Sequence, residues 1–155
     1  MKYAFTNFIS EDSVMVLHGK TKLEIMDELI SRAAELTKLS QDMIYRLTWK
    51  REQMMTTGVG NGLALPHIRV NDIPHPIVIV GVTENPIDPK DYQSQDGQPV
   101  RVVVFTVAPD ENPEAYLQLL GSVSRKLRNP ELLAKLTDGT PDEKNILKIL
   151  FENAE

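Results

Sequence analysis

Apolar residues recur at helical spacing in the first third of the chain and predict two helices there. Thr21 and Glu24 have the spacing of a capping box. Behind Thr21, apolar residues follow at intervals of three or four: Leu23, Met26, Leu29, Ile30, Ala33 and Ala34. Such intervals place side chains along one helix face. Ser40 is predicted to cap a second helix that reaches Arg51. Its inward-facing residues would be Met43, Ile44, Leu47 and Trp49.

Runs rich in β-branched residues predict strands in the middle of the chain and near its start. These runs cover residues 13–17, 63–65, 77–82 and 100–107. Two segments between them carry Pro, Asp and Asn, which favour turns, and are predicted to be loops. These loops cover residues 69–76 and 85–99.

Three pairs of a capping residue and proline predict further helices towards the C-terminus. They are Asn112-Pro113, Asn129-Pro130 and Thr140-Pro141, and the first helix, from Pro113 to about Arg128, would be the longest. The order is then a strand and two helices, a cluster of strands, and a set of helices. This order predicts a single α/β domain over residues 1–155, an α/β sandwich with a mixed β-sheet flanked by helices.

Composition and charge narrow the classes of function. The net charge of −5 disfavours nucleic acid, which is bound mainly through clustered Lys and Arg. The chain has no cysteine, so thiol catalysis and Cys-based zinc sites are excluded. His18 and His75 lack metal-ligand spacing, and we expect neither a metal nor a cofactor. Without a signal-like N-terminus or a long apolar run, the sequence predicts a cytoplasmic protein that does not insert into membranes. Whether it forms a homodimer stays open.

The segment from Arg51 to Arg69 concentrates the candidate chemistry around His67. A neutral imidazole is nucleophilic near pH 7 and can carry a phosphoryl group for a time. Arg51 and Arg69 can supply positive charge for the phosphoryl oxygens. Pro66 stiffens the backbone just before the histidine.

Other residues of this segment can supply hydrogen-bond donors. Thr56 and Thr57 offer hydroxyl groups, and glycines allow the backbone to turn tightly and approach an anion. These glycines are Gly58, Gly60 and Gly62. Their spacing fits neither a Walker A loop nor a dinucleotide fingerprint. A histidine that follows proline in a loop is more often an ordinary polar residue, so His67 alone would not identify a site.

The segment resembles the phosphohistidine signature of the IIA domains of the phosphoenolpyruvate-dependent sugar phosphotransferase system, fructose/mannitol class. That class includes the nitrogen-regulatory IIA proteins. The matching residues are Arg51-Glu52, Thr57-Gly58, Gly60-Asn61-Gly62, Leu63-Ala64-Leu65 and Pro66-His67. The resemblance continues through Pro86-Ile87-Asp88, residues 96–100 and Leu117-Gln118-Leu119-Leu120, and so covers nearly the whole chain.

This resemblance implies that Nε2 of His67 takes a phosphoryl group from an HPr-like carrier and passes it to a IIB acceptor. Arg51 would neutralise phosphoryl charge, and Thr57 would be the hydroxyl residue beside the site. Glu52 matches an acidic position of the family, although a glutamate at a helix end is usually solvated. Asn61 would serve the glycine turn, because asparagine tolerates left-handed backbone angles.

Two positions depart from the family pattern. Tyr116 stands where members commonly carry a second histidine near the phosphorylated one. Tyrosine can donate a hydrogen bond but cannot shuttle a proton near pH 7. Ile68 stands where a small residue is usual, and its bulk is expected to narrow partner access to His67. Met54 and Met55 are expected in the core or as an apolar border of the site.

Three hypotheses follow. The first is a phosphocarrier that receives a phosphoryl group on His67 and hands it to a IIB domain. The second is a regulatory module, like the nitrogen-related proteins, whose phosphorylation changes its affinity for partner proteins. This second hypothesis is favoured by Tyr116. The third is a degenerate domain that has kept the fold and lost the transfer.

Overall fold

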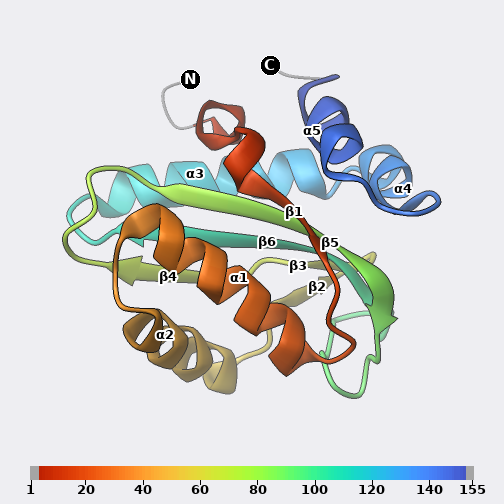
Figure 1. Ribbon diagram of the computed structural model, residues 1–155, viewed down its shortest axis with the longest axis horizontal. Helices are drawn as coiled ribbons and strands as arrows, with labels where there is room; N and C mark the ends of the chain where they lie inside the picture. Colours follow the sequence, from red (N-terminus) through yellow and green to blue (C-terminus); the bar gives the residue numbers. More distant parts are fainter. Residues whose placement is uncertain (1–3, 153–155) are drawn as a thin grey trace.

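The computed structural model describes residues 4–152, and its centre is a six-stranded mixed sheet (Figure 1). The strands are β1 (Val14–Leu17), β2 (Gly58–Gly60), β3 (Leu63–Ala64), β4 (His67–Val70), β5 (Ile77–Ile87) and β6 (Val100–Pro109). Their order is β1-β5-β6-β3-β2, and β4 also pairs with β6. β1 runs parallel to β5, β5 is antiparallel to β6, and β3 and β4 both run parallel to β6. β6 therefore fixes the register of three other strands.

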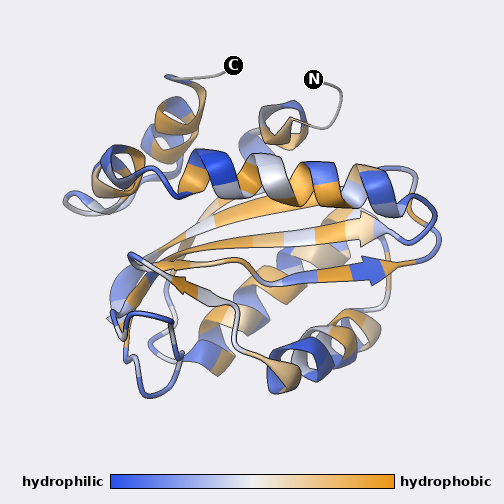
Figure 2. Cartoon of the chain, turned by 180° about the vertical axis from the view of Figure 1, so that it is seen from behind, coloured by the Kyte–Doolittle hydropathy of each residue, from blue (hydrophilic) through white to orange (hydrophobic). Residues whose placement is uncertain are grey.

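Helices cover both faces of the sheet. On one face lie α1 (Lys22–Thr37) and α2 (Gln41–Met54), and on the other lie α3 (Pro113–Leu127), α4 (Pro130–Thr137) and α5 (Glu143–Glu152) (Figure 1). Two short 3₁₀ helices, η1 (Phe5–Phe8) and η2 (Glu11–Ser13), precede β1. Figure 2 shows apolar strands enclosed between helices whose outer surfaces are hydrophilic. This is the α/β sandwich with a mixed sheet that the sequence predicts, so the fold class is confirmed.

The central strands are apolar on both faces because each face is covered by helices. Along β6, Val103 and Phe105 pack in the core on the α1 and α2 side, whereas Val102 and Val104 pack in the core on the α3 side. This alternation is the two-residue period of a strand. It explains why residues 102–105 form an unbroken apolar run within this strand.

Local capping determines where most helices begin. Oγ of Ser40 accepts the N–H of Met43, and Oδ1 of Asn112 accepts the N–H of Ala115, as the sequence predicts. Thr21 also caps α1, but the Glu24 carboxylate accepts the N–H of Lys20 instead of completing the capping box.

Several predicted boundaries are wrong. α5 begins at Glu143, where Oδ2 of Asp142 accepts the N–H of Asn145, and not at the Thr140-Pro141 pair. β5 continues to Ile87, so three residues of the predicted loop 85–99 belong to a strand. β2 and β4 escaped prediction because both are short: β2 has three residues, two of them glycine, and pairs with neighbouring β3, whereas β4 pairs with the distant strand β6. Leu23, predicted to face the core, is half exposed.

Candidate functional site

His67 is the first residue of strand β4, in contrast to the loop position expected from its Pro-His context. It lies opposite Thr106 of β6, and the Pro66 carbonyl accepts the N–H of Thr106 at 3.1 Å. Because strand side chains alternate between faces, His67 and Arg69 share one face of β4, and Ile68 and Val70 share the other. The burial of β4 follows this alternation, since Ile68 and Val70 are both buried.

The imidazole of His67 is fixed by its own chain. Nδ1 lies 2.8 Å from the Leu65 carbonyl oxygen. Because a carbonyl oxygen only accepts, Nδ1 carries the proton and donates it, which leaves the lone pair of the neutral ring on Nε2. Burial is the main cause that lowers the pKa of His67. The Leu65 hydrogen bond opposes it, the positive charge of Arg51 lowers the pKa further by a smaller amount, and Glu52 raises it least. The ring is therefore neutral and nucleophilic at pH 7.

His67 borders an open pocket of about 190 Å³. The pocket is lined by Leu47, Arg51, His67, Ile68, Arg69 and Tyr116. Nη1 of Arg51 donates to the carbonyl of Met55 at 3.1 Å, and a guanidinium has five N–H donors, so several others can bind an anion. Arg69 differs, because its Nη2 lies 2.9 Å from Oδ1 of Asp110 and so its charge is partly neutralised.

Tyr116 forms another wall of the pocket, from the first turn of α3. Its ring centroid lies 6.0 Å from that of His67, and Cζ of Arg69 lies 5.3 Å from the centroid of the tyrosine ring. Burial raises the pKa of Tyr116, and the positive charges of Arg69 and Arg51 offset this only in part. The phenol therefore stays protonated at neutral pH, where it can donate a hydrogen bond but cannot exchange a proton freely.

Gly60 and Asn61 do not lie beside His67, so the expected convergence of the glycine turn on the site is wrong. The Gly62 carbonyl accepts the N–H groups of Arg101 and Val102 in β6, whereas His67 lies opposite Thr106. Four to five residues of extended chain span roughly 15 Å. The turn is bound elsewhere: the N–H of Asn61 donates to Oδ2 of Asp96 at 2.8 Å. Asn61 itself has φ 55°, the left-handed angle that was expected.

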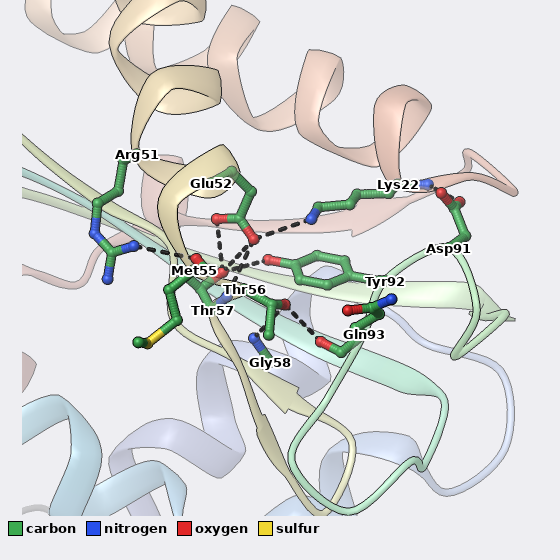
Figure 3. Close-up of polar contacts among 10 residues, drawn as sticks. All are labelled: Lys22, Arg51, Glu52, Met55, Thr56, Thr57, Gly58, Asp91, Tyr92 and Gln93. Atoms are coloured by element: carbon green, nitrogen blue, oxygen red, sulfur yellow. Dashed lines mark hydrogen bonds and ion pairs between the residues drawn. The ribbon is translucent and has the colours of Figure 1, made fainter.

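Glu52 and Thr57 lie behind the pocket in a buried polar cluster (Figure 3). The Thr57 hydroxyl donates to the Glu52 carboxylate, at 2.9 Å from Oε2, and so is not turned towards a phosphoryl group. The expectation of a solvated Glu52 is also wrong, because Lys22 and Tyr92 enclose its side chain. Sequence reasoning missed Lys22 and Tyr92, since each looks like an ordinary surface or core residue by itself.

Two predictions from the sequence concern apolar side chains near the pocket. Ile68 borders the pocket but is only 5% exposed and packs in the core below α1 and α2. That its bulk narrows partner access to His67 stays a prediction. Met54 and Met55 are 77% and 68% exposed at the end of α2, next to Arg51. This exposure excludes a core role and agrees with an apolar border, whose use in docking stays a prediction.

The family can now be identified by comparison with known proteins. The family model described as "Phosphoenolpyruvate-dependent sugar phosphotransferase system, EIIA 2" matches residues 7–153. The chain belongs to this family. The resemblance inferred from the segment around His67 is thus confirmed, and with it a general role as an EIIA phosphotransfer protein.

Individual relatives of this EIIA protein include a nitrogen regulatory protein and a fructose-specific EIIABC component. It is 31% identical over 132 residues to a nitrogen regulatory protein of Bradyrhizobium diazoefficiens, covering 84% of each chain. It is 26% identical over 128 residues to the fructose-specific EIIABC component of Bacillus subtilis, covering 82% of this chain and 20% of that one. Its fold is similar to that of nitrogen regulatory protein IIA-Ntr from Neisseria meningitidis, with a TM-score of 0.81 at 20% identity, covering 94% and 97% of the two chains.

Two further observations concern the described part of the EIIA chain. Among residues 4–152, none of the helices is both long enough and apolar enough to cross a membrane. Over the same described residues, no group of three or more His, Asp or Glu side chains is arranged to hold a metal ion.

Proposed function

We propose that this EIIA protein is a cytoplasmic phosphocarrier whose acceptor atom is Nε2 of His67 and whose donor is an HPr-like phosphocarrier protein. One observation carries the proposal: the Leu65 carbonyl accepts the Nδ1 proton of a histidine that borders an open pocket. In a neutral ring this leaves only Nε2 able to attack.

The transfer would proceed by displacement at phosphorus. The Nε2 lone pair forms the new N–P bond while the bond between phosphorus and the donor nitrogen breaks, and the electron pair of that bond returns to the donor. The His67 ring becomes more positive as it gains the phosphoryl group. The Leu65 carbonyl stabilises this charge, because its hydrogen bond to Nδ1 strengthens as the ring becomes cationic.

Arg51 is proposed as the main partner of the phosphoryl oxygens. It borders the same pocket as His67, and the hydrogen bond from its Nη1 to the Met55 carbonyl leaves other guanidinium donors for an anion. Arg69 would contribute less, because Asp110 already balances part of its charge. Tyr116 would donate a hydrogen bond from the far wall of the pocket.

The proposed acceptor of the phosphoryl group is a IIB domain. A regulatory output is the second candidate, in which the added charge of roughly −1.5 to −2 changes affinity for a partner protein. Two observations favour it: Tyr116 stays protonated where a second proton-exchanging group would assist onward transfer, and a relative 31% identical to this chain is a nitrogen regulatory protein.

Intact-protein mass spectrometry at neutral to basic pH tests the acceptor. The protein would be incubated with phosphoenolpyruvate, Enzyme I and an HPr-type carrier, beside His67→Ala and the exposed control His75→Ala. We expect one acid-labile phosphoryl group in the wild type and in His75→Ala, and none in His67→Ala. Phosphorylation of His67→Ala, or none of the wild type with several carriers, would overturn the proposal.

A second measurement distinguishes transfer to a IIB domain from a regulatory change in affinity for a partner protein. Phosphorylated protein would be mixed with a fructose-class IIB domain, and loss of the phosphoryl mass followed over time. Rapid loss supports the carrier. A phosphoprotein that persists while its affinity for a partner differs from that of the unmodified form supports regulation.

A further inference from the structure

A buried carboxylate joins four parts of the chain next to the phosphoryl pocket. The Glu52 side chain is 1% exposed at the end of α2. Its Oε1 accepts the backbone N–H of Thr57 at 3.1 Å, and both carboxylate oxygens lie within 3.0 Å of the Thr57 hydroxyl. Glu52 therefore holds Thr57 by main chain and side chain together (Figure 3).

The direction of these hydrogen bonds can be assigned. An ionised carboxylate only accepts, so the Thr57 hydroxyl donates to Glu52. The Tyr92 hydroxyl lies 2.6 Å from Thr57 Oγ1 and must then be the donor in that pair. Burial and the neighbouring carboxylate both raise the pKa of Tyr92, which keeps this donor proton in place.

Lys22 neutralises the buried charge. Its Nζ lies 3.1 Å from Oε1 of Glu52 and 4.4 Å from the centroid of the Tyr92 ring. Its backbone N–H donates to Oδ2 of Asp91 at 2.7 Å, which ties the start of α1 to the segment that carries Tyr92. A buried carboxylate with a cation and several donors is stable in one arrangement only, so the cluster is rigid.

This cluster is connected to the imidazole by two hydrogen bonds, one between backbone groups and one from the ring to a backbone carbonyl. The Thr57 carbonyl accepts the N–H of Leu65 at 3.0 Å, and the Leu65 carbonyl accepts Nδ1–H of His67 at 2.8 Å. Thr57 is thus held by Glu52 through its N–H and hydroxyl, and its carbonyl holds Leu65, the residue whose own carbonyl orients His67. The position of the Leu65 carbonyl depends on this chain of contacts.

We propose that Glu52 and Thr57, locked by Lys22 and Tyr92, form a positioning unit that keeps His67 in the Nδ1–H tautomer with Nε2 free in the pocket. The importance of this tautomer for phosphoryl transfer rests on the proposed function. The positioning itself is a property of the unmodified protein and can be measured without any phosphoryl donor.

The test removes the Thr57 hydroxyl. Thr57→Val keeps the shape and the backbone N–H but loses the donor to Glu52, and Thr57→Ser restores it. Thr48→Val is the matched control, because Thr48 is also buried and its hydroxyl donates within α2, to the Ile44 carbonyl at 2.7 Å. The readout is the ¹⁵N chemical shifts of His67, which report its tautomer, together with the rate of phosphorylation.

In Thr57→Val we expect His67 shifts that show a mixture of tautomers and a phosphorylation rate about tenfold lower, a typical effect of removing a supporting hydrogen bond. Thr57→Ser should return both to wild-type values, and Thr48→Val should leave both unchanged even if it melts earlier. A wild-type tautomer in folded Thr57→Val would overturn the proposal. If wild-type protein takes no phosphoryl group, the proposed function fails, yet the ¹⁵N shifts still decide the positioning.

Discussion

The rings of His67 and Tyr116 face each other across the site, with centroids 6.0 Å apart and planes tilted by 54°. The two residues come from different layers of the fold, His67 from the sheet and Tyr116 from the first turn of α3. The side chain at position 116 is thus placed to influence a phosphoryl group on Nε2.

Replacing Tyr116 with histidine is expected to speed onward transfer. An imidazole has an ordinary pKa near 6.5 and can exchange a proton at neutral pH, which a protonated phenol cannot. We expect the transfer rate from phosphorylated Tyr116→His to a IIB domain to rise about tenfold, a modest value for acid–base assistance. Tyr116→Phe, which keeps only the ring, is the control and should not be faster. An unchanged rate in Tyr116→His would contradict the account of this position.

The pH dependence of phosphorylation follows from the lowered pKa of His67. The nucleophile is the neutral ring, so the rate should be flat from pH 8 to about 6.5, the ordinary histidine value. It should fall only at lower pH, as the ring is protonated. The measurement is the initial rate of phosphorylation at each pH in this range, with the pH dependence of the donor determined separately. A fall in the phosphorylation rate centred above pH 6.5 would show that burial does not determine the pKa of His67.

Removing the Arg51 charge should raise the pKa of His67 and slow phosphorylation. We expect Arg51→Met to lose about a hundredfold in rate, comparable to removing one donor to a developing anion. Arg69→Met should lose less, about tenfold, because Asp110 already balances Arg69. An NMR titration of His67 and single-turnover rates measure both effects. Arg46→Met, on the same helix and paired with Asp42, is the control and should match wild type.

Because the glycine turn lies away from His67, we predict that a substitution in the turn leaves the phosphorylation rate nearly unchanged. Asn61→Ala keeps a Cβ at φ 55° but removes the polar side chain that lets asparagine tolerate this left-handed region, which is disfavoured by about 1 kcal/mol for other residues with a Cβ. We therefore expect a small loss of stability on chemical denaturation. The phosphorylation rate should stay within about twofold of wild type, since roughly 15 Å separates the turn from the acceptor. A large loss of rate without unfolding would place the turn in the site after all.

Two Gly→Ala changes should alter stability in opposite directions. A Cβ at Gly58 would lie 2.3 Å from the Gln93 carbonyl oxygen, a backbone atom that cannot move aside. Gly58→Ala should cost about 1–3 kcal/mol of unfolding free energy, as overpacking does. At Gly121, inside α3, the nearest atom is the flexible end of Arg125. Gly121→Ala should stabilise by about 0.5–1 kcal/mol. Urea denaturation of both variants measures the difference.

The sequence predicted features that local chemistry determines. Ser40 and Asn112 cap their helices through contacts three residues away, and the β-branched runs form the central strands. The pairing of His67 with Arg51 at one pocket also followed from the sequence, because both lie in a signature segment of the family.

Features set by contacts between distant residues were not predictable in this way. Glu52 is buried because Lys22, thirty residues earlier, and Tyr92, forty residues later, enclose it. The glycine turn lies away from His67 because both segments take their register from β6, which comes later in the chain. No local pattern encodes such a register.

Because His67 begins a strand that pairs with β6, its backbone is fixed by the sheet. A catalytic loop would have to lose conformational freedom each time a partner arrived, at roughly 1–2 kcal/mol for each residue ordered. Here that loss has already occurred during folding, and the hydrogen bond from Nδ1 to the Leu65 carbonyl holds Nε2, the proposed acceptor atom, in one orientation. An approaching protein therefore needs only to align itself, which suits the proposed carrier, whose surface would be met and released many times by a donor and an acceptor.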